Sequence, residues 1–302
     1  MAILVDLSQV VFGACYAFKD DLNPEKTKQN KEEAVNLIRH VILSQLKYYN
    51  VKYRQQYGKL IISCDGGHYW RRAIFPYYKA NRKKAREKQD IDWELVFQVF
   101  NEMIKDLREY FMFKVVQVDQ AESDDVIAIL SKYFQTNEIQ DDIMFSIKQP
   151  IIIISSDKDF IQLQKYDNVK QISPRNKMDV TDPDPNRYLQ EKCLRGDRGD
   201  NIVNVLTQDD AFDVGVKSTK LTQKKIDELL NEGYDNCKDQ TIKRNWKRNK
   251  VLIDFDYIPK SIEAKIIEEY QKPVQGNKAK AFNYLIQHNC NLLVKDIEDF
   301  VP

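Results

Sequence analysis

The sequence predicts an α/β protein with a mostly parallel central sheet flanked by helices. Apolar runs recur along the first half of the chain, helical patterns separate them, and an acidic residue closes each run. The runs are AILVDL, LIISCD, FKVVQVD and IIIISSD, at residues 2–7, 60–65, 113–119 and 151–157. Continuous apolar runs are typical of strands buried on both faces, and strands that alternate with helices form parallel βαβ units.

The helices are predicted from apolar residues that recur every three or four positions. Segment 32–49 places four such residues on one stripe: Val35, Ile38, Ile42 and Leu46. Segment 92–111 does the same with Trp93, Phe97, Phe100, Ile104 and Leu107. Segment 121–134 gives a third helix. Each crossover should be right-handed and should cover one face of the sheet.

Composition excludes several classes of protein. The 302 residues are 42% hydrophobic, enough for a sizeable core, yet no run is long and apolar enough to cross a membrane. No signal peptide is visible, so we expect a soluble, cytoplasmic protein. We also expect a monomer. The 5 cysteines are far apart and never form a CxxC pair, and the 3 histidines are equally scattered. Disulfides, a cysteine-bound zinc ion and a histidine base are therefore not expected.

Acidic residues follow every predicted strand. Asp6, Asp65 and Asp157 come at the ends of the first, second and fourth strands, and Glu122 comes shortly after the third. Because parallel strands end at one edge of a sheet, these side chains should line the crevice where α/β folds place their ligands. Residues 122 and 124 diverge on an ideal helix, so they should lie at the irregular start of the third helix, with Asp125 assisting. Asp159 is a further candidate. Asp197 and Asp200 also join the candidates, and their spacing of three would place both on one face of a helix.

A single aspartate after a strand is as often a turn former or a helix cap as a functional residue. Six to eight carboxylates at one edge are different, because they would repel one another and raise their own pKa values unless divalent cations bound there. Ligation by oxygen alone favours Mg²⁺, with Mn²⁺ as a substitute. The pattern therefore predicts a metal centre.

Cations are concentrated in one segment, although the formal net charge is only +1. Residues 71–88 hold eight Lys or Arg and one acid, interleaved with aromatic residues. Such interleaving suits a phosphate backbone whose bases stack on rings, whereas the alternative is a solvated helix face. The nucleic-acid-binding candidates are Arg71, Arg72, Tyr78, Lys79, Arg82, Lys83 and Lys84.

Several stretches together resemble the structure-specific 5′ nucleases, the superfamily of flap endonucleases and 5′-3′ exonucleases, and within it the RNase H of T-even-type bacteriophages. The matching stretches are VDLSQ, YWRR, YYKANRKKAR, AESDD, SSDKDF, GDRGDN and VLIDFDYIP, in the family's order. The resemblance implies the PIN-like 5′ nuclease fold. Residues 1–185 would form the nuclease domain, with a basic arch at about 68–92, and residues 186–302 a smaller helical domain that binds duplex.

Carried over residue by residue, the resemblance implies one metal site formed by Asp6, Asp65, Glu122, Asp124 and Asp157. It implies a second metal site formed by Asp159, Asp197 and Asp200. Lys79 and Arg82 would lie in the arch near the scissile phosphate and would act in catalysis with Asp124 and Asp157. Tyr78 would stack on the terminal base.

The reaction that the resemblance implies is metal-dependent hydrolysis of phosphodiester bonds from the 5′ ends of RNA·DNA and DNA duplexes, and cleavage of 5′ flaps. Its biological role would be removal of RNA primers during lagging-strand replication, in the cytoplasm of an infected bacterium if the chain is phage-encoded. A phage single-stranded-DNA-binding protein is an expected partner, and a sliding clamp is a weaker one, since the chain starts at its first strand. Residues 201–221 lack the family's glycine-rich hairpin, which leaves its potassium site in doubt.

Two alternatives remain. A catalytically silent DNA-junction binder would tolerate loss of the acids, yet none of the expected acidic positions is vacant. A haloacid-dehalogenase-type phosphatase needs a second aspartate two residues after the one that follows the first strand, and Ser8 stands at that position.

Overall fold

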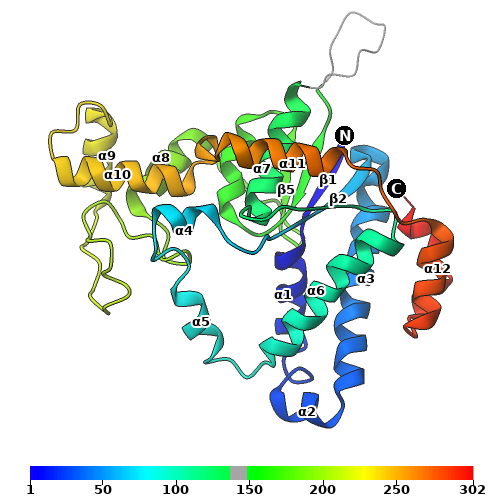
Figure 1. Ribbon diagram of the computed structural model, residues 1–302. Helices are drawn as coiled ribbons and strands as arrows, with labels where there is room; N and C mark the ends of the chain where they lie inside the picture. The colour runs from blue at the N-terminus through cyan, green and yellow to red at the C-terminus, as the bar shows by residue number, and fades with distance from the viewer. Residues whose placement is uncertain (137–147, 302) are drawn as a thin grey trace, which may run out of the picture.

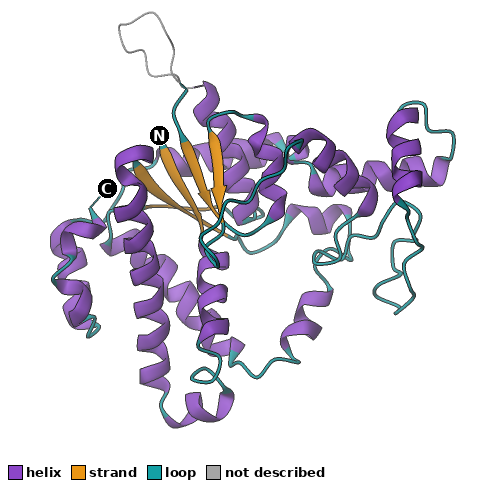
Figure 2. Cartoon of the chain, turned by 180° about the vertical axis from the view of Figure 1, so that it is seen from behind, coloured by secondary structure: helices purple, strands orange, loops and turns teal. Residues whose placement is uncertain are grey.

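A computed structural model describes residues 1–136 and 148–301, and its centre is a five-stranded sheet in the order β3-β2-β1-β4-β5 (Figure 1). The strands are β1 (Ala2–Asp6), β2 (Lys59–Cys64), β3 (Lys114–Gln117), β4 (Ile151–Ile154) and β5 (Val169–Ile172). Every neighbouring pair is parallel, and Leu4 of β1 pairs with Ile61 on one side and Ile153 on the other. The predicted parallel sheet is therefore confirmed, and Figure 2 shows its strands pointing the same way.

Helices account for most of the remaining described chain. The first group comprises α1 (Leu7–Ala17), α2 (Pro24–Gln29), α3 (Lys31–Tyr57), α4 (Trp70–Ile74), α5 (Asn81–Arg86), α6 (Trp93–Tyr110) and α7 (Ser123–Thr136). The second comprises α8 (Pro185–Arg195), α9 (Gln223–Glu232), α10 (Gln240–Ile253), α11 (Lys260–Gln271), α12 (Lys278–Gln287) and α13 (Asn291–Val294). Short 3-10 helices are η1 (Lys158–Lys165), η2 (Phe255–Tyr257) and η3 (Ile297–Phe300). None of these helices is long and apolar enough to cross a membrane.

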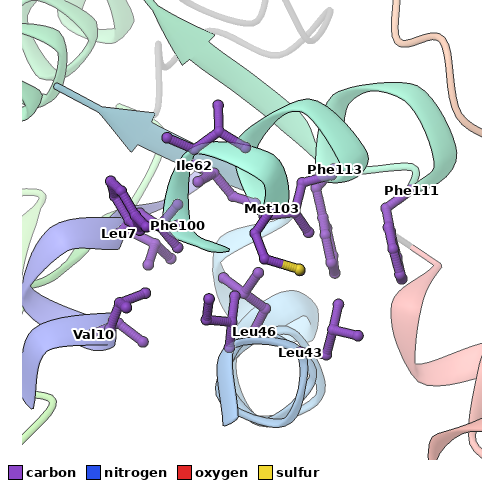
Figure 3. Packing of buried hydrophobic residues seen from close by; sticks show 14 of the residues in the cluster. Leu7, Val10, Leu43, Leu46, Ile62, Phe100, Met103, Phe111 and Phe113 are labelled. Atoms are coloured by element: carbon purple, nitrogen blue, oxygen red, sulfur yellow. The ribbon is translucent and has the colours of Figure 1, made fainter. Parts of the chain in front are cut away.

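Helices cover both faces of the sheet. Alternate residues of β1 point to opposite sides, so Ile3 and Val5 pack with α1, α3, α6 and α12, whereas Ala2 and Leu4 pack with α7, η1 and α11. Figure 3 shows part of the first cluster, where residues from α1, α3 and α6 meet β2; they include Val10, Leu43, Leu46, Ile62, Phe100 and Met103. Burial on both faces explains why the strands are apolar throughout.

The C-terminal third divides into two parts. Helices α8, α9 and α10 form a separate cluster around Trp246, which also takes in Phe75 and Tyr78 from the arch segment. Helices α11 and α12 instead return to the sheet, where Ile262 and Tyr284 join its two clusters. Helices α8–α10 thus pack in a cluster of their own, whereas α11–α13 pack against the sheet. The domain boundary near residue 185 stays a prediction.

The segment at 68–92 leaves the sheet after β2 and returns at α6. Figure 1 shows it as an arm that runs through α4 and α5 beside the carboxyl end of the sheet. Helix α5 buries no residue, whereas α4 buries Trp70 and Arg71. The arch, as we call residues 68–92, therefore has an anchored base and an exposed middle.

Candidate active site

Hydrogen bonds from serine side chains link the ends of β1, β2 and β4. Asp6 caps α1 and accepts hydrogen bonds from the hydroxyls of Ser123, at 3.2 Å, and Ser155, at 3.1 Å. Asp65 accepts one from the hydroxyl of Ser8, at 2.7 Å, and another from the backbone N–H of Ser123, at 3.0 Å. The acids that close the strands therefore meet at the carboxyl edge of the sheet.

Glu122 lies just before α7, at the irregular helix start that the residue spacing predicts. Its carboxylate is fully buried and accepts hydrogen bonds from Arg71, at 2.7 Å, and from the hydroxyl of Tyr78, at 2.9 Å. It also pairs with Lys79. Asp124 follows in the first turn of α7. The charges of Asp157, Lys79 and Asp6 act on its carboxyl group.

Arg71 is a correction to the predicted nucleic-acid contacts. Its side chain is only 3% exposed and pairs with Asp125 at 2.8 Å and with Glu122 at 2.7 Å. It also donates to the carbonyl of Leu252, at 2.8 Å. Arg71 therefore joins the arch base, α7 and α10, and no face of it is left for a substrate. Asp125, which we expected to assist metal binding, is likewise taken up by this pair and by the indole N–H of Trp70.

Tyr78 is a second correction. Its ring is 2% exposed, and its hydroxyl donates to Glu122 or to Asp200, at 2.9 and 3.1 Å. A ring so buried cannot stack on a terminal base. Phe75, three residues earlier, packs in the same cluster with α8–α10.

Lys79 and Arg82 lie against the acids. The ammonium of Lys79 lies between Glu122 and Asp200, 3.6 Å from the latter, and the guanidinium of Arg82 is 2.7 Å from Asp200. Although burial raises the pKa of Asp200, these two cations outweigh it and hold that pKa below its ordinary value. Lys79 also has a positive φ of 56° and its backbone N–H donates to the carbonyl of Asp200, at 2.9 Å.

The remaining predicted cations are more distant from the acids. Arg72 is exposed, with its guanidinium over the ring of Tyr69. Lys83 and Lys84 are exposed on α5. Their contacts with nucleic acid stay a prediction.

Three more acids meet at the other end of the site. Asp157 caps η1 and accepts the backbone N–H of Asp159, at 2.9 Å. Lys192 of α8 lies between Asp159 and Asp197, 2.9 Å from the latter. No pattern in the sequence singles out Lys192, because a lysine on an amphipathic helix is ordinary.

The GDRGDN stretch is a turn and not the helical face that we expected. Gly196 ends α8 with a φ of 70°, and the carboxylate of Asp197 then accepts the backbone N–H groups of Gly199, at 2.7 Å, and Asp200, at 3.2 Å. The turn still directs both acids to the site. We call the eight gathered residues the acid rim: Asp6, Asp65, Glu122, Asp124, Asp157, Asp159, Asp197 and Asp200.

Burial and mutual repulsion dominate the electrostatics of the acid rim. Burial, together with the charges of Asp65 and Asp157, raises the pKa of Asp6 to about 7. Burial and the charge of Asp157 raise the pKa of Asp124 well above its ordinary value. Burial also raises the pKa of Asp157, although Lys192 opposes the shift. These carboxylates destabilise one another's charge, as expected of a site that binds cations.

The carboxylate oxygens of the acid rim are the donor type that divalent cations prefer, but the distances between them are too long to hold an ion. Among residues 1–136 and 148–301, no three Asp, Glu, His or Cys side chains stand close enough to hold an ion as they lie. Lys79 and Lys192 instead pair with four of the acids, Glu122, Asp200, Asp159 and Asp197. The assignment of the acid rim as metal ligands therefore stays a proposal, supported by its oxygen-only donors and by the raised pKa values of Asp6, Asp124 and Asp157.

The pH dependence of stability should reveal the repulsion. A carboxyl whose pKa is raised on folding adds stability below its unfolded pKa, near 4, and this stability is lost as pH rises through the folded value. Metal-free protein should therefore unfold at lower urea concentration at pH 8 than at pH 5. Asp6→Asn should reduce the difference. Stability that rises between these pH values would contradict the raised pKa values.

Gly196 should be indispensable to the turn that carries Asp197 and Asp200. A Cβ atom at this position would lie 2.4 Å from the carbonyl oxygen of Ile202, and the φ of 70° disfavours any other residue. Gly196→Ala should cost about 1–3 kcal/mol in the free energy of unfolding and displace the turn. Gly215→Ala is the matched control, because Gly215 has a φ of 76° but open space around it. Equal losses in urea unfolding would show that the close approach is unimportant.

Comparisons with known proteins agree with this fold. The family described as "5'-3' exonuclease, N-terminal resolvase-like domain" matches residues 1–193, and that described as "T4 RNase H, C terminal" matches residues 184–300. Ribonuclease H of Enterobacteria phage T4 is 33% identical over 98% of this chain and 95% of that protein. The 5'-3' exonuclease of Buchnera aphidicola subsp. Schizaphis graminum is 23% identical over 74% of this chain and 71% of that protein.

Solved structures share the fold along the whole chain. The phage T5 5'-exonuclease with bound zinc ions matches with a TM-score of 0.58 and 17% identity, over 100% of this chain and 99% of that one. The phage T5 D15 flap endonuclease with DNA and metal ions matches with a TM-score of 0.55 and 16% identity, over 99% and 98%. Together the matches define the class of protein, a nuclease. The chain belongs to the 5'-3' exonuclease family, as its motifs predict.

Proposed function

We propose that this nuclease is metal-dependent, that it hydrolyses phosphodiester bonds from the 5′ ends of RNA·DNA and DNA duplexes, and that it cleaves 5′ flaps. One observation carries the proposal: Asp6 and Asp65, from separate strand ends, bond to Ser123, and the adjacent Glu122 meets Asp200 of the 196–201 turn at the arch cations Lys79 and Arg82. The relatives named Ribonuclease H and flap endonuclease support the choice of substrates.

The acid rim would hold two Mg²⁺ ions, which Mn²⁺ could replace. Asp6, Asp65, Glu122, Asp124 and Asp157 would hold one ion, and Asp159, Asp197 and Asp200 the other. Such ions lower the pKa of bound water and stabilise charge on a leaving oxygen. Three structures of the phage T5 relative contain metal ions, which supports this assignment.

The chain's own cations would bind and orient the scissile phosphate. Lys79 and Arg82 now pair with Glu122 and Asp200, and a phosphate could exchange for one carboxylate partner of each cation. Their positive charge would then lie beside the phosphate as negative charge grows on it. The arch holds both residues at the carboxyl edge of the sheet through the bond from the Lys79 N–H to the Asp200 carbonyl.

Lys79→Ala should lower the single-turnover rate about 100- to 1,000-fold, because one preorganised cation is lost from the site. Metal binding should persist, since Lys79 is no ligand. The measurement is rapid-quench cleavage of a 5′-labelled substrate at saturating enzyme, with Mn²⁺ binding followed by calorimetry. Lys84→Ala is the control, because Lys84 is exposed on α5. An unchanged rate would remove Lys79 from the proposed catalytic residues.

The biological role we propose is removal of RNA primers and short flaps during lagging-strand replication. The lysines and arginines of 200–250 would help the C-terminal helices bind duplex. A single-stranded-DNA-binding protein is the expected protein partner, and a sliding clamp a weaker one. The test incubates 5′-labelled RNA·DNA hybrid and flap substrates with the protein, in Mg²⁺ and in EDTA. Binding without cleavage in Mg²⁺ would favour a silent junction binder.

A further inference from the structure

A cleft of about 880 Å³ opens beside the acid rim and has no role in the proposed mechanism. Helix α8 forms one wall, and the residues after β4 form the other. Asp157 and Asp197 of the acid rim lie in its lining, together with Lys158, Tyr188, Lys192 and Arg198. The cleft is thus continuous with the site where the phosphate would react.

Tyr188 is the aromatic residue of this lining. Its side chain is half-buried and makes no side-chain hydrogen bond or ring contact with another described residue. Burial raises the pKa of its phenol, and the charges of Asp157, Asp197 and Asp182 raise that pKa further. The ring therefore lies close to two acids of the acid rim and to Asp182, with no side-chain hydrogen bond or ring contact within residues 1–136 and 148–301.

Two cations of the cleft are also without a side-chain partner. Lys158 and Arg198 are exposed and form no ion pair with any part of the chain that the structure describes. By contrast, Arg187 pairs with Glu191 and Asp227, and Arg195 pairs with Glu191. The cations of α8 are therefore largely balanced, whereas Lys158 and Arg198 remain available. The lining also holds Asp182 and Asp184, which accept backbone N–H groups and form no ion pair within the described residues.

Both free cations stand next to the acids of the site. Lys158 directly follows Asp157, and Arg198 directly follows Asp197. The carbonyl of Arg198 accepts a hydrogen bond from the side chain of Asn81, at 3.1 Å, which places this end of the cleft at the arch. Cations that flank an aromatic ring beside a phosphate site suit a polynucleotide.

We infer that this cleft binds one unpaired nucleotide of the substrate strand, next to the scissile phosphate. The base stacks on the ring of Tyr188, and Lys158 and Arg198 contact the phosphates on either side. The volume lies in the range of about 300–1,000 Å³ that is usual for small-molecule sites. The nucleotide is unpaired because stacking on a ring needs an open base face. The inference rests on the proposed nuclease function and names a substrate contact within it.

The test measures binding in EDTA, where cleavage does not interfere. A 5′-tailed duplex carries 2-aminopurine at successive positions around the cleavage site, and fluorescence reports stacking at each. Wild-type protein should change the signal at one position. Tyr188→Leu should remove that change and weaken binding about 5- to 150-fold, the range measured for loss of base stacking. Tyr188→Phe should retain both, because it keeps the ring.

The cations are tested by the salt dependence of the same binding. The double variant Lys158→Gln, Arg198→Gln should lower the log-log slope by about 0.7 for each single-strand phosphate that the protein no longer neutralises. The controls are Tyr48→Leu and Lys170→Gln, exposed residues of α3 and β5, and both should bind as wild type does. Wild-type binding by Tyr188→Leu, or equal weakening by Phe and Leu, would overturn the inference. Cleavage by the wild type in Mg²⁺ decides the proposed function separately.

Discussion

Replacing Asp157 or Asp124 with asparagine should lower the cleavage rate at least about a thousandfold. Metal ions contribute several kcal/mol of transition-state stabilisation, and about 1.36 kcal/mol corresponds to a factor of ten in rate. Each substitution removes a charge from the acid rim with little change in shape. DNA binding should persist, because the cations of the arch remain. The measurement is single-turnover cleavage in Mg²⁺ beside binding in EDTA.

Stability separates a lost metal ligand from a damaged fold. Asparagine can still accept the N–H of Asp159 as Asp157 does, so the cap of η1 should survive in Asp157→Asn. Asp124→Asn also removes a carboxylate whose pKa is raised by burial and by Asp157, so metal-free protein should lose no stability. Asp167→Asn, at an exposed position, is the control. Full cleavage activity in either acid variant would refute the assignment of the site.

Arg71→Ala should destabilise the protein by about 3–5 kcal/mol, the usual cost of removing one partner from a buried ion pair. The substitution leaves the carboxylates of Asp125 and Glu122 buried without their guanidinium, and it frees the carbonyl of Leu252. Urea unfolding followed by circular dichroism measures the loss. The neighbouring Arg72→Ala is the matched control, because Arg72 is exposed and should matter by less than about 0.5 kcal/mol.

Arg71 and Arg72 are adjacent in the sequence, yet we expect their replacement to have very different effects on stability. If Arg71→Ala and Arg72→Ala were equally stable while Arg71→Ala alone bound DNA poorly, the prediction of Arg71 as a nucleic-acid contact would be right. Loss of stability with DNA binding intact below the unfolding transition would support its role as a link between arch and sheet.

The sheet and its acidic edge were predictable because they depend on local patterns. Strands covered on both faces must be apolar, and the acids stand directly after them. β5 was not predicted because its four residues, VKQI, have two polar residues at the centre and so form no continuous apolar run. The prediction for 196–201 was wrong because a spacing of three fits both a helix face and a carboxylate that caps its own turn.

The roles within the arch were harder to predict. Cations mixed with aromatic residues describe a nucleic-acid surface and a buried ion-pair network equally well, and only the fold assigns Arg71 and Tyr78 to the second. Lys192 and Tyr188 lie on a helix with no unusual composition, and they become notable only because α8 passes beside Asp157. Contacts between distant segments carry information that residue spacing does not.

The central place of β1 bears on how the chain is made by the ribosome. One neighbour of β1 begins at residue 59 and the other at residue 151. A nascent chain therefore exposes one apolar edge of this strand until half the protein has been synthesised, and such edges invite association with other chains. Non-local pairing of this kind also slows folding. Production of the protein should accordingly benefit from low temperature and from chaperones that shield nascent chains.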